Sequence, residues 1–312
     1  NCTESTGMSC YSTSIIGNAS LAWIQRHLET TRSSTKNAQP FLALISLKAP
    51  HILDGPGFPV AIPAPWYSNA SIPEESVPRL PNYNYSAKDH HWLVRSQAPM
   101  TMEEGQRVDD LYISRLKTLI SVDDLVEALI SDSGIPLDNT YILFTSDNGY
   151  RLGQFRMPMA KLHAYENDIR VPMLMRGPLI AKNTTSDLLS THVNLMPTLL
   201  GLVDLHDQIH KATTTTMNHN KGDDATKPIA NLTPLVVPET MDGINLASCI
   251  AMHDDDENNN NNPTTPTTKS TTSSSCTSPS TLLIEYTSLG AVFRYNHTVD
   301  TYNHSFVALR IL

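Results

Sequence analysis

Residues 141–154 read Tyr-Ile-Leu-Phe-Thr-Ser-Asp-Asn-Gly-Tyr-Arg-Leu-Gly-Gln. The apolar residues 141–146 are typical of a strand, and they lead into Asp147, Asn148 and a glycine turn. A hard divalent cation prefers carboxylate and carbonyl oxygens, and open α/β sheets bind ligands at the carboxyl ends of their strands. Asp-Asn-Gly is also ordinary turn chemistry. The stretch therefore indicates either part of a metal site or a simple turn.

Apolar residues at helical spacing predict helices on both sides of this strand. One is expected at about 20–32 and a longer one at about 108–130. A third would begin after Asn194, whose side chain can cap it, and would tolerate Pro197 in its first turn.

Two further apolar runs read as buried strands, at 40–47 and 171–175. Residues 52–86 lie between the strand expected at 40–47 and the helix expected at 108–130. They are rich in Pro, Tyr, Asn and Ser and show no helical period. Such a segment predicts a long surface loop of the kind that frames a binding site.

Composition bounds the class of protein. The chain has 312 residues, 40% hydrophobic and 17% charged, which suits one large domain or two small ones. Its net charge of −9 argues against nucleic acid as a partner. No apolar run reaches the roughly 18 residues that a membrane span requires. An anionic ligand would therefore need a local basic pocket.

The number of glycosylation sequons favours the secretory pathway, lysosomal or extracellular. Asn-x-Ser/Thr sequons recur along the chain, and they start at Asn1, Asn18, Asn69, Asn84, Asn183, Asn231, Asn296 and Asn303. The four cysteines would permit two disulfides in that compartment, but their spacing does not reveal the pairing.

The residues around the opening stretch form a longer pattern. Downstream the chain reads Gly153-Gln-Phe-Arg-Met-Pro, then Lys161, then Tyr165-Glu-Asn-Asp-Ile-Arg-Val-Pro and Arg176-Gly-Pro. With residues 119–150, this pattern resembles the sulfatase family, and within it the N-acetylglucosamine-6-sulfatase branch. The resemblance is densest over 110–180, and weaker matches extend from Ala19 to Leu246.

The resemblance implies an α/β fold of the alkaline phosphatase-like class, a mixed sheet flanked by helices. The chain would be N-terminally truncated and would end in a partial small C-terminal antiparallel sheet. The expected parts are the downstream catalytic domain at 1–205, a flexible polar insertion at 206–240, a return to the core at 241–252, a low-complexity disordered insertion at 253–280 and the start of the small sheet at 281–312.

The same resemblance assigns roles to individual residues. Asp147 and Asn148 match the family's metal ligands for one Ca²⁺ ion, and Lys161 matches the lysine that contacts the sulfate. His51 ends an Ala-Pro-His strand and would bind sulfate or protonate the departing sugar oxygen. Two of these residues have ordinary alternatives, because Lys161 would otherwise be an exposed loop lysine and His51 a structural histidine.

Residues 90–95, His-His-Trp-Leu-Val-Arg, resemble a stretch of the same branch. His91, Trp92 and Arg95 would line the sugar pocket, with the indole packing on the ring and Arg95 pairing an anion. A simple loop anchor is the alternative interpretation. The charged residues of 165–170 are expected to form scaffold ion pairs, and position 151 carries arginine where the branch has histidine.

The chain also lacks parts of the family's pattern. None of its cysteines stands in the Cys-x-Pro-Ser-Arg or Cys-x-Ala-Ser-Arg motif that is oxidised to formylglycine, and the upstream paired aspartates are missing. We therefore expect a downstream fragment with negligible sulfatase activity by itself. Its full-length form would remove 6-O-sulfate from glucosamine residues of heparan or keratan sulfate. The alternatives are a phosphodiesterase or phosphatase of the same superfamily and a degenerate, non-catalytic glycan-binding protein.

Overall fold

In a computed structural model, the chain is described at residues 10–33, 39–53, 58–73, 77–217, 241–251, 281–287, 292–294, 297–300 and 305–311. It divides into two compact units. The first takes residues up to 137 with 145–172 and 285–306, and the second takes 138–144, 173–284 and 307–312. All the candidate site residues lie in the first unit.

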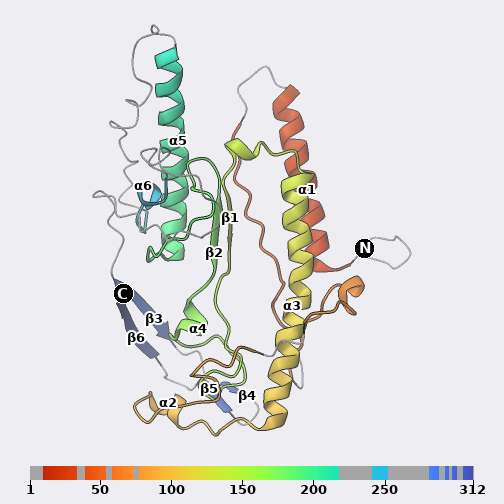
Figure 1. The fold of residues 1–312 in the computed structure, drawn as a ribbon, viewed down its shortest axis with the longest axis vertical. Helices are drawn as coiled ribbons and strands as arrows, with labels where there is room; N and C mark the ends of the chain where they lie inside the picture. Colours follow the sequence, from red (N-terminus) through yellow and green to blue (C-terminus); the bar gives the residue numbers. More distant parts are fainter. Residues whose placement is uncertain are drawn as a thin grey trace, which may run out of the picture. The chain divides into compact units, whose positions relative to one another are not determined.

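The helices and strands of the described residues are drawn in Figure 1. In chain order they are α1 (Ser12–Ser33), η2 (Pro65–Tyr67), α2 (Trp92–Arg95), α3 (Met102–Ser131), η3 (Leu137–Asn139), β1 (Ile142–Thr145), α4 (Glu166–Ile169), β2 (Met173–Arg176), η4 (His192–Asn194), α5 (Leu195–Met217), α6 (Ala247–Ile250), β3 (Thr281–Thr287), β4 (Val292–Arg294), β5 (His297–Asp300) and β6 (Ser305–Ile311).

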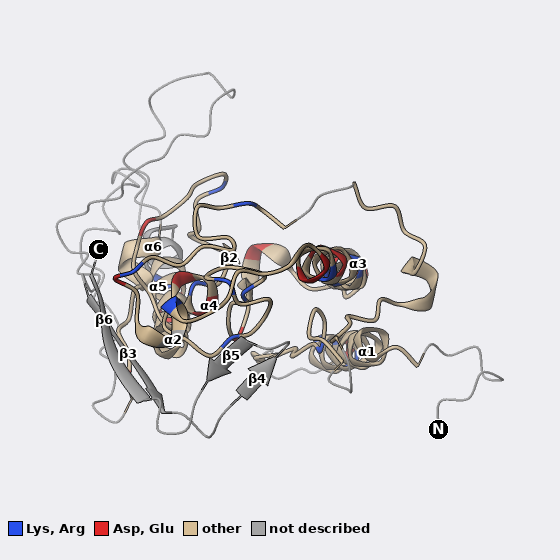
Figure 2. Cartoon of the chain, turned by 90° about the horizontal axis from the view of Figure 1, so that it is seen from below, with Lys and Arg blue, Asp and Glu red and all other residues tan. Residues whose placement is uncertain are grey.

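The two long helices of the first unit, α1 and α3, pack side by side (Figure 1). A β-carbon at Gly17 would lie 2.8 Å from Leu125 Cδ1, so the glycine allows this close approach. A capping box formed by Thr101 and Glu104 starts α3, which satisfies orphan N–H groups at the helix start. The predicted helices at 20–32 and 108–130 are confirmed, and both begin earlier than the periodicity indicated. Acidic residues of α3 are coloured red in Figure 2.

The core of the first unit contains two clusters of buried apolar side chains. The larger consists of Ile52, Ala61, Val77, Val108, Leu111, Leu152 and Met159, and the smaller of Val94, Phe155, Met157 and Ala160. Three members of the larger cluster belong to the segment 52–86. At its described residues, 52–53, 58–73 and 77–86, this segment has no helix apart from the short η2, as predicted. It is not only a surface loop, because three of its apolar residues are part of the core.

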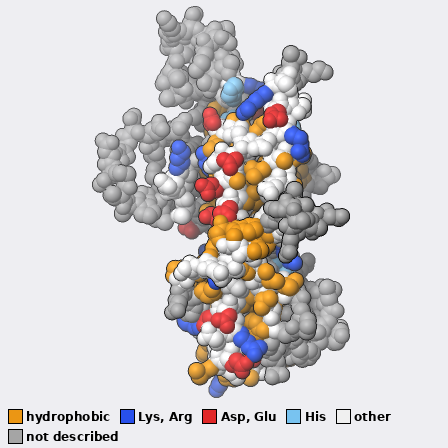
Figure 3. Space-filling view, turned by 90° about the vertical axis from the view of Figure 1, so that its right-hand side faces the viewer, with side chains coloured by type: hydrophobic (Ala, Val, Ile, Leu, Met, Phe, Trp, Pro, Cys, Tyr) orange, Lys and Arg blue, Asp and Glu red, His pale blue; other side chains and the backbone are white. Residues whose placement is uncertain are grey.

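The predicted buried strand at 40–47 is wrong. Residues 39–48 adopt no regular structure, and Leu42 and Leu44 are 67% and 92% exposed. Exposed apolar side chains are visible on the surface in Figure 3. An apolar run becomes a strand only when a neighbouring strand accepts its backbone hydrogen bonds, and these residues belong to none of the described sheets.

The described strands form three two-stranded sheets, β1 with β2, β3 with β6, and β4 with β5. The last pair is antiparallel, with an irregular register between Val292 and Phe293. The strands predicted at 141–146 and 171–175 are confirmed as β1 and β2. The predicted burial of the second strand is wrong, because Met173 and Leu174 are 42% and 60% exposed. Helices and strands together agree with the α/β class.

In the second unit, α5 packs against the segment 241–251. The side-chain oxygen of Asn194 accepts the Ile244 N–H at 2.9 Å, so the residue expected to cap α5 instead joins its start to this segment. Leu246 and Cys249 are buried, and Cys249 is disulfide-bonded. Burial also raises the pKa of Tyr141, which donates to the Leu202 carbonyl, to about 12.

The predicted boundary at residue 205 falls inside α5, which continues to Met217. Residues 218–240 of the expected polar insertion and the whole low-complexity segment 253–280 lie outside the described residues. Within the described part of the chain, no helix has the length and apolar character that crossing a membrane would require.

Candidate functional site

The strand β1 ends at Thr145 and leads directly into the Asp147–Asn148 turn. The carboxylate of Asp147 accepts the Asn148 N–H at 3.0 Å, and the Ser146 hydroxyl donates to the Asn148 carbonyl at 2.9 Å. Both bonds are local contacts between a side chain and the backbone of the same turn. Asp147 remains exposed, so the turn presents a carboxylate to solvent at the end of a strand.

Lys161 meets this turn from a separate loop. Its ammonium donates to the Asn148 side-chain oxygen at 3.1 Å. The Asn148 amide nitrogen in turn donates to the Gly149 carbonyl at 2.8 Å. An ammonium carries three donors, and the bond to Asn148 uses one. Two predicted site residues are therefore in direct contact, and the remaining lysine protons can bind an anionic oxygen.

Backbone contacts hold the two loops together. The Arg151 N–H donates to the Ala160 carbonyl, and the Gly149 N–H donates to the Asp168 carbonyl, both at 2.8 Å. A β-carbon at Gly149 would lie 2.1 Å from the Asn167 carbonyl oxygen. Only glycine fits at this close approach between two backbone segments. The glycine after the Asp-Asn pair is therefore required by packing.

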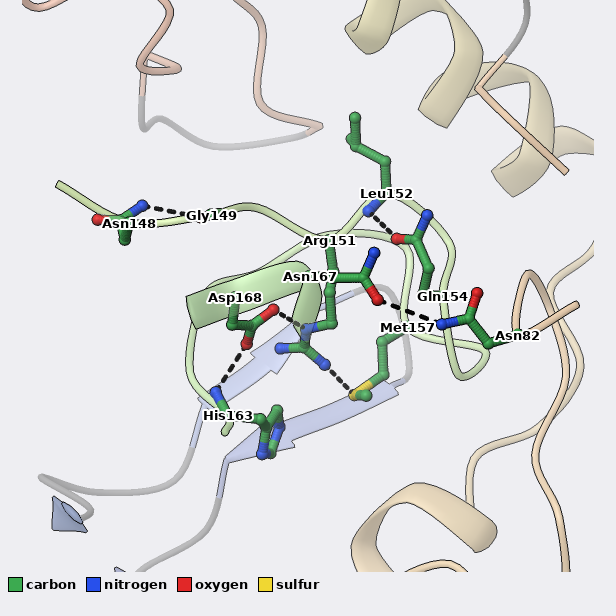
Figure 4. Close-up of polar contacts among 10 residues, drawn as sticks. All are labelled: Asn82, Asn148, Gly149, Arg151, Leu152, Gln154, Met157, His163, Asn167 and Asp168. Atoms are coloured by element: carbon green, nitrogen blue, oxygen red, sulfur yellow. Dashed lines mark hydrogen bonds and ion pairs between the residues drawn. The ribbon is translucent and has the colours of Figure 1, made fainter. Parts of the chain in front are cut away.

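A buried ion pair lies beneath these loops (Figure 4). Arg151 Nε donates to Asp168 Oδ1 at 2.9 Å, and their side chains are 0% and 2% exposed. The other Asp168 oxygen accepts the His163 N–H at 2.7 Å, and one terminal Arg151 nitrogen contacts the Met157 sulfur. The second terminal nitrogen has no hydrogen-bond partner among the described residues.

Burial and charge shift the pKa values of this pair in opposite directions. Desolvation raises the pKa of Asp168, while the Arg151 charge and the hydrogen bonds from Arg151 and two backbone N–H groups oppose the rise. Desolvation likewise lowers the pKa of Arg151. Asp168 thus links the loop that carries Asn148 to the loop that carries Lys161. The sequence indicated a scaffold ion pair at Asp168 but did not identify Arg151 as its partner.

His51 lies at the turn that follows the exposed segment 39–48. Its Nδ1 is 2.7 Å from the Ile52 carbonyl, and because a carbonyl only accepts, this nitrogen carries the hydrogen. The side chain is exposed, which leaves Nε2 to exchange a proton with a ligand. Its hydrogen bond to Ile52 does not connect it to the Asn148–Lys161 pair.

The three predicted sugar-pocket residues lie on or beside the short helix α2. The rings of His91 and Trp92 are 5.6 Å apart, and Trp92 is 49% exposed. Arg95 donates through Nη1 to the Lys88 carbonyl at 3.5 Å. All three are exposed, so this segment offers an indole face and a guanidinium to solvent.

The donor set is too small for a Ca²⁺ site by itself. Among the described residues, no group of three or more His, Cys, Asp or Glu side chains could hold a metal ion. Calcium takes six to eight oxygens, and Asp147 and Asn148 supply only a carboxylate and an amide oxygen already bonded to the Lys161 ammonium. The residues present therefore do not fit a complete metal site.

Comparison with known proteins adds independent information. The sequence model of the sulfatase family matches residues 18–205. N-acetylglucosamine-6-sulfatase of Capra hircus is 40% identical over 195 residues, which cover 62% of this chain and 32% of that protein. The Homo sapiens N-acetylglucosamine-6-sulfatase is 39% identical with the same coverage.

A Drosophila melanogaster protein described as an extracellular sulfatase is 35% identical over 198 residues, 62% of this chain and 16% of its own length. The chain therefore spans a third or less of the length of these relatives. No solved structure matches it.

Proposed function

This chain belongs to the sulfatase family, and we propose from that premise that it takes part in hydrolysing sulfate esters. The proposed substrate is the 6-O-sulfate of N-acetylglucosamine units in a sulfated glycosaminoglycan such as heparan or keratan sulfate. Two relatives at about 40% identity are described as N-acetylglucosamine-6-sulfatases, which supports this choice of sugar and position.

One observation carries the proposal: the bond between Lys161 and Asn148. A turn at a strand end presents Asn148, and a cation from another loop lies 3.1 Å from its side-chain oxygen. An ordinary surface lysine extends into solvent and does not make such a contact. The contact places the positive charge of Lys161 at the half-buried Asn148, which follows the exposed Asp147, and a sulfate oxygen would be bound there.

The chain's own residues would act by binding and proton transfer. Lys161 would donate to a sulfate oxygen with the protons that Asn148 does not use. His51 would give a proton to the departing sugar oxygen through Nε2, because Nδ1 is held by the Ile52 carbonyl. Trp92 would pack on the sugar ring, with His91 beside it, and Arg95 would pair with an anionic substituent.

Asp147 and Asn148 remain proposed ligands of one Ca²⁺ ion, which in this family would neutralise the sulfate. The other ligands, and the formylglycine nucleophile, would have to come from outside the described residues. We therefore propose that the chain by itself has negligible sulfatase activity.

The experiment compares two proteins, residues 1–312 alone and the full product of the gene's reading frame, called the extended protein below. Both are assayed with a fluorogenic N-acetylglucosamine 6-sulfate and, in parallel, with an aryl phosphate diester. We expect the extended protein to hydrolyse only the sulfate ester. Preference for the phosphate diester would instead support the phosphodiesterase alternative. Absence of the cysteine motif upstream, with no turnover, would support the non-catalytic one.

The role of Lys161 is tested in the extended protein. We expect Lys161→Ala to lower kcat/KM by about 10²–10³-fold, the usual effect of removing one donor to a developing anion. The matched control is Lys182→Ala, which removes an exposed lysine in the second unit. Equal activity of both variants would contradict the proposed role.

We also propose that the protein passes through the secretory pathway, and the sequons allow a site-by-site test. Asn69 and Asn183 are exposed, whereas the Asn84 side chain accepts the Met100 N–H at 2.7 Å and donates to the Met100 carbonyl. A glycan would be attached to the Asn84 amide nitrogen, which is half-buried and already donates to the carbonyl of the buried Met100. In secreted protein, glycopeptide mapping should find Asn69 and Asn183 occupied and Asn84 empty.

A further inference from the structure

A small basic cavity has neither Asn148 nor Lys161 in its lining. Its volume is about 350 Å³, and its lining consists of Ser86, Ala87, Lys88, Arg95 and Arg156. Three of the five lining residues are cations and none is a carboxylate, in a chain whose net charge is −9. Like charges repel, and an anion bound between them would offset that repulsion. The concentration of positive charge is therefore a feature of this cavity and not of the chain as a whole.

The arginines are anchored in a way that leaves donors for a ligand. Arg156 Nη1 donates to the Gln97 carbonyl at 3.1 Å, and Arg95 Nη1 donates to the Lys88 carbonyl at 3.5 Å. Each guanidinium has five N–H donors in a fixed fork. One bond to a carbonyl orients the fork, and the other donors stay available to an anion.

Two buried donors of the lining have no partner among the described residues, Ser86 Oγ and Arg156 Nε. Buried polar atoms are nearly always hydrogen-bonded, so two orphans on one cavity indicate a missing acceptor. The backbone at Arg156 is also left-handed, with φ of 60°. Residues other than glycine rarely adopt this backbone conformation, and those that do are found preferentially at functional sites.

We propose that this cavity binds an anionic substituent of an acidic oligosaccharide, a sulfate or a sugar carboxylate, through Arg156, Arg95, Lys88 and the Ser86 hydroxyl. Trp92 begins the helix α2 that ends at Arg95, three residues later and on the same side of a helical turn. Its exposed indole gives the sugar ring a surface beside the anion site. Naming a glycan as the ligand rests on the proposed function, whereas the anion site itself does not.

Binding to residues 1–312 is measured by calorimetry at 0.15 M salt. The probes are inorganic sulfate, a heparin hexasaccharide and the unsulfated N-acetylheparosan hexasaccharide, whose only anions are carboxylates. The variants are Arg156→Asn, which suits the left-handed backbone, and Arg95→Gln. The control is Arg26→Gln, which removes one positive charge from the exposed side of α1.

We expect each cavity variant to weaken hexasaccharide binding about ten-fold or more, the loss of a charge-assisted hydrogen bond. Arg26→Gln should change it by less than about two-fold, because exposed distant charges are screened. Binding of the heparin hexasaccharide alone identifies sulfate as the ligand group, and equal binding of both identifies the carboxylate. Thermal unfolding of each variant verifies that it folds.

The proposal is overturned if neither hexasaccharide binds, or if Arg26→Gln weakens binding as much as Arg156→Asn does. It is also overturned if both cavity variants bind like the unmodified chain. Failure of the proposed function gives a different result. In that case the extended protein would not hydrolyse the sulfate ester, while hexasaccharide binding would still depend on Arg156.

Discussion

Two segments of the first unit both contain many apolar residues but differ in how they are held in place. The loop 147–170 is mostly irregular, yet contacts at Gly149, Arg151 and Asp168 fix its conformation, and several of its apolar side chains belong to the core. The segment 39–48 is apolar and strand-like, yet it joins none of the described sheets and leaves Leu44 92% exposed. Close packing and hydrogen bonds between backbone segments therefore determine order in this unit, and apolar content alone does not.

The largest expected effect is loss of the buried carboxylate. Asp168→Ala leaves the Arg151 guanidinium buried without its partner, and such changes cost about 3–5 kcal/mol of the free energy of unfolding. Urea unfolding followed by tryptophan fluorescence measures this. The control is Glu103→Ala, which breaks an exposed pair with Arg107 on α3 and should cost no more than about 1 kcal/mol. Equal losses would show that the buried pair does not order the loop.

The next test concerns the close approach at Gly149. Gly149→Ala would place a β-carbon 2.1 Å from the Asn167 carbonyl oxygen, and such overpacking costs about 1–3 kcal/mol. Gly105→Ala is the matched control inside α3, where a β-carbon meets only the Tyr83 hydroxyl at 3.6 Å. This control should gain about 0.5–1 kcal/mol, because alanine favours helix over glycine. The same sign for both changes in urea unfolding would refute the packing argument.

A smaller effect is expected at Asn84, which ties the neighbouring segment to the loop. Its N–H donates to the Gly153 carbonyl, and its side chain bonds both backbone polar groups of Met100. Asn84→Ala should lower the free energy of unfolding by about 1–2 kcal/mol, because the Met100 N–H loses its acceptor. Asn69→Ala, at an exposed turn, should have almost no effect. Hydrogen exchange of the Met100 amide gives a second measurement.

The smallest effect is expected in the apolar segment. Leu44→Lys replaces an exposed leucine and should change the free energy of unfolding by less than about 0.5 kcal/mol. By contrast, Leu111→Ala removes a core side chain that is 2% exposed and should cost about 2–5 kcal/mol. A large loss for Leu44→Lys would mean that the segment 39–48 packs against something in solution.

The fold was predictable in segments whose own residues show a helical period or a short apolar run before a turn. The helices α1 and α3 follow from apolar residues at helical spacing, and β1 from a short apolar run before a glycine turn. The failure at 40–47 has a different cause, because an apolar run does not specify its strand partner. The core residues Ile52, Ala61 and Val77 were missed because they lie in a segment without periodicity.

The candidate site was predictable only residue by residue. Asp147, Asn148 and Lys161 were found through a family resemblance, and the structure joins the last two. Their roles, and those of His51 and the α2 residues, remain predictions. Arg156 was not proposed as a site residue, because a single arginine in a loop gives no sign of its neighbours. The sequence shows three separate basic residues, at positions 88, 95 and 156, but does not indicate that they share a cavity.

The sequence by itself determined the local elements and the family, because helical spacing, capping residues and motif spacing are properties of contiguous residues. Only the tertiary structure decided that Arg151 pairs with Asp168, that Lys161 contacts Asn148, and that three cations share one cavity. Those contacts depend on the path of the backbone between distant residues. That path is set by the packing of the whole unit, which no short stretch of sequence contains.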